Sequence, residues 1–360
     1  MVEVLQKLIR QVQSAQDLDR DQVREAVLAL VAEDVPVSVK ADFLSALAHK
    51  GESAAEIAAF AEELRARAIP PPLDPQWRRD RVILDVVGTG GDRAGTFNIS
   101  TTAALICAAA GVCVAKHGNR AVTSRSGSAD VLEALGIPVQ AEPEMAARML
   151  QRCGFAFFFA PVYHPVFRQI APARRLCAER GDRTVFNFLG PLLNPVRPDA
   201  QLMGVPRSEL CSPMAAVLVE LGVRRGMVVC GQVTDEVGTG TVSVDELLPW
   251  GRTVAVAFGL DEPGVVKPEI VPPRPVRAAP LEAIRGADAN ANAALIEAIF
   301  QGRERGPCRE AALYNAAAAL WVAGVANSME HGWSLAERVL EEGLAARKLA
   351  ELRVAARDAA

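Results

Sequence analysis

Three features are missing from this sequence of 360 residues: a large net charge, paired cysteine motifs and long apolar runs. The formal net charge of −4 gives no electrostatic reason to expect nucleic-acid binding, although a local basic patch would not be visible in that sum. We therefore expect no nucleic-acid partner.

The seven cysteines are scattered, and no two of them form a CxxC motif. Most lie in apolar runs such as Val228-Val229-Cys230, so we interpret them as buried reduced thiols rather than as disulfides or zinc ligands. No apolar run approaches the length of a membrane span, and the first residues do not combine a cationic segment with an apolar core. These absences predict a cytoplasmic protein without a membrane partner.

Half of the residues are hydrophobic, and the length is sufficient for two domains. Up to about residue 68, apolar positions recur at the i, i+3, i+4 spacing of amphipathic helices. Ser53 and Glu56 have the spacing of a capping box and would begin one of these helices. The proline-rich stretch from Pro70 to Pro75 can continue neither a helix nor a central strand. We therefore predict an all-helical domain over residues 1–75.

The pattern changes after this boundary. The run from Val82 to Val87 is short, nearly all apolar and followed by glycines, as expected of a strand that is buried on both faces. Further strands are predicted at 112–115, 155–160, 227–230 and 253–257, and helices at 100–110, 290–300, 308–326 and 335–354. This alternation indicates a parallel-rich sheet covered by helices. The predicted fold class is α/β, with residues 76–360 forming a large domain around a central sheet and ending in helices.

The strongest local motif is Gly88-Thr89-Gly90-Gly91-Asp92, directly after the first predicted strand. Glycines allow the backbone to approach a ligand closely, and consecutive amides can point at one anion. The segment from Thr96 to Thr101 then opens a helix, whose free N–H groups and dipole favour phosphate. A tight turn followed by an N-cap explains these residues equally well. The loop matches neither GxGxxG nor a P-loop, so neither dinucleotide nor ATP binding is favoured.

The second strand is followed by Lys116 to Arg120, and then by hydroxyl-bearing and small residues from Thr123 to Asp130. Strand C-termini in open α/β sheets converge on one crevice, so we expect Lys116 and Asn119 to face the same pocket as the glycine-rich loop. Hydroxyl groups, amides and the lysine together could bind a pyrophosphate. The alternative is a serine-rich cap beside a solvated lysine.

Two acidic pairs follow the strand at 227–230. Asp235-Glu236 lies in a glycine-rich loop and is a candidate for binding Mg²⁺, which prefers carboxylates together with water and substrate phosphates. Asp245-Glu246 is interpreted as a solvated turn.

Four segments, in this order and spacing, resemble the anthranilate phosphoribosyltransferase family. They are GTGGD (88–92), TFNIST (96–101), KHGNR (116–120) and SGSADVLEALG (126–136), and the stretches at 183–195, 235–236 and 314–318 are similar too. The resemblance spans nearly the whole chain. It implies an active site between the two domains, helices from about 165–205 that join the helical domain in space, and a homodimer formed through the helical domains.

The resemblance also implies the roles of individual residues. Two Mg²⁺ ions per subunit would be held by Ser100, Asp235 and Glu236. Anthranilate would contact Gly88, Asn119 and Arg174, with Arg174 positioned for its carboxylate. Phosphoribosyl pyrophosphate would be bound by Gly88, Gly91, Asp92, Thr96, Asn98, Ser100, Thr101, Lys116, His117, Gly118, Asn119, Arg120, Ser124 and Ser128.

The activity implied is transfer of the phosphoribosyl group to the amine of anthranilate in tryptophan biosynthesis. An aromatic amine is neutral at physiological pH, so no indispensable general base is expected. His117 and His164 would orient the acceptor or have a structural role. The alternatives are the same chemistry on another aromatic amine, a pyrimidine nucleoside phosphorylase, and a non-catalytic relative that binds nucleic acid.

Overall fold

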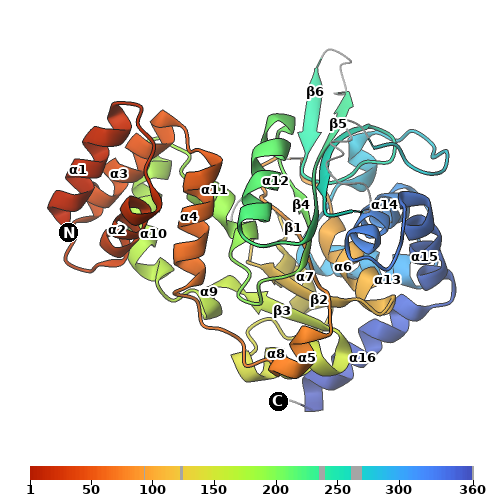
Figure 1. The fold of residues 1–360 in the computed structure, drawn as a ribbon. Coiled ribbons are helices and arrows are strands. Elements are labelled where there is room, and N and C mark those ends of the chain that lie inside the picture. Colours follow the sequence, from red (N-terminus) through yellow and green to blue (C-terminus); the bar gives the residue numbers. More distant parts are fainter. Residues whose placement is uncertain (93, 122–124, 235–239, 261–269, 359–360) are drawn as a thin grey trace.

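The computed structural model describes residues 1–92, 94–121, 125–234, 240–260 and 270–358. Figure 1 shows a smaller lobe of helices, which contains the N-terminus, beside a larger lobe built around a sheet. The predicted fold class is confirmed: an all-helical N-terminal part accompanies an α/β part with a mostly parallel sheet. Within the residues described, no helix combines the length and the apolar character needed to cross a membrane.

The helical lobe combines helices from two separate parts of the chain (Figure 1). They are α1 (Val2–Gln13), α2 (Arg20–Val31), α3 (Val37–Lys50), α4 (Ala54–Arg65), α10 (Phe167–Glu179) and α11 (Phe186–Leu189). α10 contacts α2 and α3, and α11 contacts α4. Apolar side chains from both parts, such as Phe43, Phe60 and Ile170, are fully buried in one core. The two later helices therefore complete the N-terminal bundle.

The predicted capping box is present at the start of α4. Ser53 Oγ accepts a hydrogen bond from Glu56 N (3.3 Å), and Glu56 Oε2 accepts one from Ser53 N (2.8 Å). The Glu56 carboxylate also accepts hydrogen bonds from Lys50 Nζ (2.7 Å) and from Leu18 N (3.0 Å). Glu56 thereby links the start of α4 to the end of α3 and to the segment between α1 and α2.

A seven-stranded sheet forms the centre of the larger lobe, in the order β3-β2-β1-β4-β5-β6, and β7 also pairs with β5. β3, β2, β1, β4 and β5 are parallel, whereas β6 and β7 run antiparallel to β5. The parallel arrangement brings the C-terminal ends of β1, β2 and β4 to one edge of the sheet. The strands are β1 (Ile83–Gly88), β2 (Cys113–Gly118), β3 (Phe155–Phe159), β4 (Ala200–Gly204), β5 (Arg225–Thr234), β6 (Thr241–Val244) and β7 (Arg252–Phe258).

Helices cover both faces of the sheet. α6 (Ile99–Ala109) contacts β1 and β2, and α14 (Pro307–Val322) contacts β4 and β5, whereas α12 (Cys211–Glu220) contacts β5 and β7. Along β5, Val229 belongs to the core shared with α6 and α14, and its neighbour Val228 belongs to the core shared with α12. Further helices of this lobe are α5 (Pro75–Arg79), α7 (Ser128–Ala134), α8 (Pro143–Cys153), α9 (Ala160–Tyr163), α13 (Ala289–Phe300), α15 (Met329–Glu341) and α16 (Leu344–Asp358).

The central strand β4 was not among the predicted strands. The helices expected over about 165–205 end with the 3₁₀ turn Gly190–Leu192, and Ala200–Gly204 then pairs with β1 on one side and β5 on the other. The strand has the sequence AQLMG and contains no β-branched residue, so its local propensity did not indicate a strand.

The predicted strand at 227–230 is longer in the structure. β5 continues to Thr234 and forms an antiparallel hairpin with β6, which was not predicted. The predicted helix at 335–354 is divided into α15 and α16, and Gly343 between them has a φ of +68° that interrupts a regular helix. Both differences arise where one element ends and the next begins, and the pattern of apolar residues does not predict these boundaries.

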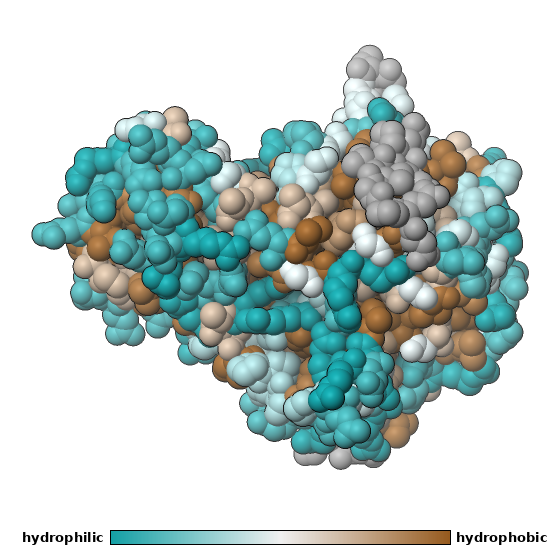
Figure 2. All heavy atoms as spheres, in the orientation of Figure 1, coloured by the Kyte–Doolittle hydropathy of each residue, from teal (hydrophilic) through white to brown (hydrophobic). Residues whose placement is uncertain are grey.

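The two lobes share one apolar core. α4 packs against α12, so the buried side chains of the helical lobe are continuous with Met214 and Leu218 on one face of the sheet. Arg20 on α2 forms ion pairs with Glu62 and with Glu220, at the C-terminal end of α12. Figure 2 shows hydrophilic residues over most of the visible face of the helical lobe and an indentation of the surface between the lobes. The lobes are therefore joined by packing as well as by the connecting segments.

Replacement of Ser53 by alanine would leave Glu56 N without its hydrogen-bond acceptor at the start of α4. We expect a loss of about 1 kcal/mol in the free energy of unfolding, the usual effect of removing an N-cap side chain. Denaturant unfolding of Ser53→Ala measures this value.

Ser14→Ala is the matched control, because Ser14 is exposed after the end of α1 and its hydroxyl donates to Arg10 O (3.0 Å) at the surface. Its effect should stay within about 0.5 kcal/mol. Equal stability losses in the two variants would contradict a special contribution of the Ser53 cap.

Candidate active site

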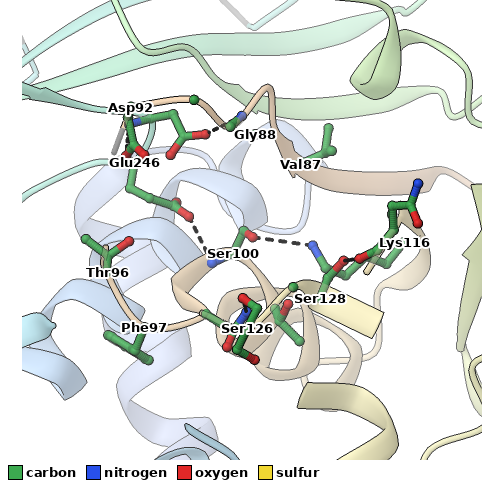
Figure 3. Close-up of a pocket in the computed structure, with 18 of the residues that line it drawn as sticks. Val87, Gly88, Asp92, Thr96, Phe97, Ser100, Lys116, Ser126, Ser128 and Glu246 are labelled. Atoms are coloured by element: carbon green, nitrogen blue, oxygen red, sulfur yellow. Dashed lines mark hydrogen bonds between the residues drawn. The ribbon is translucent and has the colours of Figure 1, made fainter. Parts of the chain in front are cut away.

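A cavity of about 400 Å³ opens at the C-terminal ends of β1 and β2. Its wall combines the glycine-rich loop, the start of α6, the end of β2, the segment before α7 and the two residues that follow β6. Figure 3 shows how polar side chains from these segments face one another across the cavity. The wall is formed by residues 87–88, 90–92, 95–98, 100–101, 116–119, 125–128 and 245–246.

The glycine-rich loop turns away from β1 in a conformation that requires glycine. Gly90 and Gly91 have φ angles of +69° and +83°, which side-chain-bearing residues rarely adopt. The amide of Gly90 donates to Asp245 Oδ2 (2.8 Å), so this loop is fixed against the segment after β6. Asp92, at the end of the motif, lies on the cavity wall.

The start of α6 supplies hydroxyl groups and the first helix amides to the same cavity. Asn98 is the N-cap residue, and its amide group donates to Ser126 O (3.2 Å) across the cavity wall. Ser100 N donates to Glu246 Oε1 (3.2 Å). Thr101 is fully buried, and its hydroxyl has no hydrogen-bond partner among the described residues. The start of α6, where the sequence predicted a phosphate-binding helix end, therefore lies on the cavity wall.

Lys116 extends from β2 beneath the cavity and is 1% exposed. Its ammonium group donates to Val86 O (2.6 Å) and to Ser100 Oγ (3.4 Å). Burial lowers the pKa of Lys116, and the nearby carboxylates of Asp85 and Glu246 act in the opposite direction. The lysine is therefore a buried donor at the cavity rather than the solvated side chain of the alternative interpretation.

Arg120 does not line the cavity, although the resemblance implied a contact with the donor substrate. Its guanidinium forms ion pairs with Asp130 (3.0 Å) and Glu133 (2.8 Å) on α7. Asp130 also accepts hydrogen bonds from the amides of Ala121 and Gly127. Arg120 and Asp130 thus hold the two ends of the segment before α7 together.

Asp245-Glu246 is not a solvated turn, and that interpretation is wrong. Both residues lie on the cavity wall, and Asp245 N donates to Asp92 Oδ2 (3.3 Å). Burial and the neighbouring carboxyl group of Asp92 raise the pKa of Asp245 to about 7. Burial, with Asp245 nearby, also raises the pKa of Glu246 well above its usual value. The described residues nevertheless contain no group of three or more His, Cys, Asp or Glu side chains that could hold a metal ion.

Two glycines permit the close approach of Asp245 to the strand ends. A Cβ atom on Gly204, at the end of β4, would lie 1.6 Å from Asp245 O, and one on Gly88 would lie 2.4 Å from Asp245 Oδ2. The clash at Gly204 involves backbone atoms, which cannot move aside by a rotamer change. The position of the acidic pair thus depends on the absence of a side chain at Gly204.

An aromatic row leads from the cavity toward the helical lobe. His117 and His164 contact each other edge to face, His164 stacks on Phe167, and Phe167 contacts Phe186. Arg174 on α10 lies at the end of this row, with its guanidinium 5.1 Å from the Phe186 ring centre. Burial lowers the pKa of His117 to about 3 and that of His164 to about 4, so both rings are neutral at physiological pH. Arg174 itself is not part of the cavity wall.

The structure brings most of the predicted donor-site residues to one cavity. Arg120 and Arg174 lie outside its wall, and Ser124, Asp235 and Glu236 lie outside the described residues. Residues on the wall that the prediction omitted include Arg125, Ser126, Asp245 and Glu246. The predicted residues on the wall are Gly88, Gly91, Asp92, Thr96, Asn98, Ser100, Thr101, Lys116, His117, Gly118, Asn119 and Ser128.

Comparison with known proteins places this architecture in an enzyme class. Residues 80–346 match the a/b domain of the glycosyl transferase family, and residues 2–68 match the helical bundle domain of the same family. The anthranilate phosphoribosyltransferase of Thermomicrobium roseum is 42% identical over 352 residues, which cover 98% of this chain and 95% of that protein.

Solved structures agree with this placement. The crystal structure of anthranilate phosphoribosyltransferase from Thermus thermophilus has a TM-score of 0.83 and 40% identity, covering 97% of this chain and 99% of that chain. The Saccharomyces cerevisiae enzyme in complex with PRPP and Mg shares the fold, with a TM-score of 0.84 at 24% identity and coverage of 98% of both chains. This chain belongs to the anthranilate phosphoribosyltransferase family.

Replacement of Gly204 by alanine would force the backbone at Asp245 away from the end of β4. We expect a loss of about 1–3 kcal/mol in unfolding free energy from overpacking. We also expect a loss of activity of more than about tenfold, because displaced carboxyl groups no longer meet the substrate geometry. Thermal unfolding and steady-state rates measure the two effects.

Gly190→Ala is the control, since a Cβ atom at Gly190 meets nothing within 4 Å. This variant should keep its stability and activity. If Gly204→Ala retained the activity of the wild type, the observed position of the 245–246 segment would not be required for catalysis.

Proposed function

We propose that this protein transfers the phosphoribosyl group of phosphoribosyl pyrophosphate to the amine of anthranilate, giving N-(5-phosphoribosyl)anthranilate and pyrophosphate. The observation that carries the proposal is the position of Ser100. Its hydroxyl accepts from Lys116, and its amide donates to Glu246, so one residue joins the anion-binding and the acidic parts of the cavity. A substrate that carries a diphosphate together with a divalent cation requires both parts.

The donor substrate is bound by the glycine-rich loop, the start of α6, the end of β2 and Ser128. Backbone amides and hydroxyl groups of these segments hydrogen-bond its phosphate groups, and Lys116 supplies a positive charge to the diphosphate. The buried hydroxyl of Thr101, which lacks a partner among the described residues, supports this assignment because it is free to donate to a phosphate oxygen.

Mg²⁺ would be held by Ser100, Asp235 and Glu236, with two ions per subunit. The supporting observation is the position of Ser100, which lies on the cavity wall and accepts a hydrogen bond from Lys116. When bound, Mg²⁺ would neutralise charge on the diphosphate oxygens. Asp235 and Glu236 lie outside the described residues, and Asp245 and Glu246 on the cavity wall are the competing ligands.

Anthranilate lies between the cavity and the helical lobe, where it contacts Gly88 and Asn119 and where Arg174 faces its carboxylate. The aromatic row of His117, His164 and Phe167 supports this path, because it joins the cavity to the helix that carries Arg174. The low pKa values of both histidines make them poor bases, so we assign them to orientation of the acceptor.

The reaction replaces the bond between the ribose C1 and the pyrophosphate oxygen with a bond from C1 to the amine nitrogen. Pyrophosphate leaves with the bonding electron pair, and Lys116 and the start of α6 stabilise the negative charge that develops on it. The amine attacks from the opposite face with its own lone pair. The proton of the resulting ammonium passes to water, so no protein base is indispensable.

The function is tested by the loss of anthranilate fluorescence with phosphoribosyl pyrophosphate and Mg²⁺, with and without a chelator. We expect consumption that depends on both and stops with the chelator. Pyrophosphate release with a different aromatic amine, but not with anthranilate, would move the acceptor assignment. If no amine supports pyrophosphate release, the transferase proposal is contradicted. Phosphorolysis of pyrimidine nucleosides is then the next assay.

The two acidic pairs are compared by neutral substitution. Asp235→Asn and Glu236→Gln should each lower kcat/KM by about 100-fold or more and raise the Mg²⁺ concentration needed for half-maximal rate, as expected when a metal ligand is lost. Asp245→Asn and Glu246→Gln are the matched variants and should raise that Mg²⁺ concentration by less than about threefold, as expected of carboxyl groups that do not bind the metal. The reverse ranking would assign the metal site to Asp245-Glu246.

The acceptor assignment is tested at Arg174. Arg174→Gln should raise the KM for anthranilate by about tenfold or more, the effect of losing a charge-assisted hydrogen bond, and leave the KM for phosphoribosyl pyrophosphate nearly unchanged. Arg175→Gln, on the same helix, is the control and should leave both values unchanged. A rise in the KM for phosphoribosyl pyrophosphate alone would show that Arg174 contacts the donor and not anthranilate.

We further propose that the enzyme is a cytoplasmic homodimer formed through its helical lobes. The seven cysteines, which are all free and mostly buried, support a reducing compartment. Sedimentation equilibrium of the intact protein would separate a dimer from a monomer of 38.3 kDa.

A further inference from the structure

Asp85 is a buried carboxylate that lies outside the cavity wall. It stands in the middle of β1, is 0% exposed, and pairs in register with Gln201 of β4. Burial raises its pKa to about 6, because a charge inside a sheet is unfavourable unless other groups compensate for it. A charged residue kept in such a place requires a structural or functional reason.

Both oxygens of Asp85 accept hydrogen bonds from groups next to the cavity. Oδ1 accepts from His117 N (3.3 Å), and Oδ2 accepts from Asn194 Nδ2 (2.9 Å). Asn194 is also fully buried, and its Nδ2 donates to Ala115 O (2.7 Å) as well. The Asp85–Asn194 pair therefore holds the backbone of β2 at two points.

These two points are the residues immediately before and after Lys116. The carbonyl of Ala115 is held by Asn194, and the amide of His117 is held by Asp85. Beyond its backbone, Lys116 reaches back to β1, where its ammonium donates to Val86 O (2.6 Å). Polar contacts from Asp85 and Asn194 therefore hold the two neighbours of Lys116, and Val86 O holds its ammonium group.

Asp85 also lies close enough to Lys116 to act on its charge. Asp85 is the first of two carboxylates that favour the charged form of the lysine, and the second is Glu246. Glu246 lies on the cavity wall, whereas Asp85 lies within the sheet and outside that wall. Asp85 is therefore the carboxylate that a bound substrate does not contact.

We propose that Asp85 is a positioning residue of the donor pocket, which through Asn194 and the His117 amide fixes Lys116 for contact with the diphosphate. This inference rests on the proposed function, because it takes Lys116 to be a ligand of the donor. Loss of Asp85 should therefore weaken binding of the diphosphate while the contact of Arg174 with the acceptor, which the helical lobe contributes, stays intact.

A second contact of the same region provides a control. Gln201, also 0% exposed, donates from Nε2 to Pro191 O (2.8 Å) and so holds the segment that returns from the helical lobe. This contact does not involve the backbone on either side of Lys116. Gln201→Met keeps the side-chain volume and removes a buried hydrogen bond at the neighbouring strand.

The experiment compares Asp85→Asn with Gln201→Met in the full-length protein. For Asp85→Asn we expect a KM for phosphoribosyl pyrophosphate raised by about tenfold or more, because a charge and a well-aligned acceptor are lost, and a KM for anthranilate within about twofold of wild type. Calorimetry with inorganic pyrophosphate and Mg²⁺ should show the same weakening. Gln201→Met should leave both KM values unchanged at a similar loss of thermal stability.

An unchanged donor KM in folded Asp85→Asn, or an equal rise in Gln201→Met, would overturn the proposal. Should Asp85→Asn fail to fold, Asn194→Ala decides: a selective rise in the donor KM supports the proposal, and a wild-type value overturns it. Calorimetry distinguishes a failure of this proposal from a failure of the proposed function. If the wild-type protein binds pyrophosphate but does not consume anthranilate, only the proposed acceptor is contradicted. The comparison of Asp85→Asn with Gln201→Met then uses the affinity for pyrophosphate.

Discussion

The arrangement of the cavity depends on keeping one positive charge inside the protein. An ammonium group removed from water is strongly unfavourable unless hydrogen-bond acceptors and opposite charge surround it. For Lys116, the acceptors are a backbone carbonyl of β1 and the hydroxyl of Ser100, and the negative charges are Asp85 and Glu246. The order of the strands, the start of α6 and the segment after β6 all contribute to this environment.

On the other side of the cavity, several acidic side chains lie close together. Asp92, Asp245 and Glu246 lie close enough for their charges to oppose one another, as the raised pKa of Asp245 indicates. A diphosphate alone would add to this repulsion, and a divalent cation alone would leave Lys116 without an anionic ligand. Under the proposed function, a diphosphate that arrives together with a divalent cation brings charges of both signs to a cavity whose own groups carry both signs.

Much of this site could be predicted from the sequence because its groups follow strand ends in contiguous motifs. The glycine-rich loop, the start of α6 and Lys116 each follow a recognisable strand, and parallel strands bring their C-terminal ends together. Asp85 gave a weaker signal: it is a single charged residue within the apolar run of β1. Its partner Asn194 is 109 residues away in the chain, so no local pattern connects the two.

The interpretation of Asp245-Glu246 as a solvated turn was wrong for a related reason. The return of the chain along β6, which pairs with β5 and leads directly to Asp245, was not predicted. The role of Gly204 was equally hidden, because the backbone that approaches it lies about forty residues further along the chain. Contacts of this kind are set by tertiary packing, which local periodicity does not describe.

The shared core of the two lobes has a consequence for how such an enzyme could be recombined. The chain passes between the lobes at 66–74, at 160–166 and again at 190–199, while α4 and α12 bury their apolar faces against each other. An exchange of the helical lobe with that of a relative would need matched crossovers at all three passages, together with a compatible surface on α12. Single substitutions in α10 would therefore change the acceptor preference more readily than exchange of the whole helical lobe.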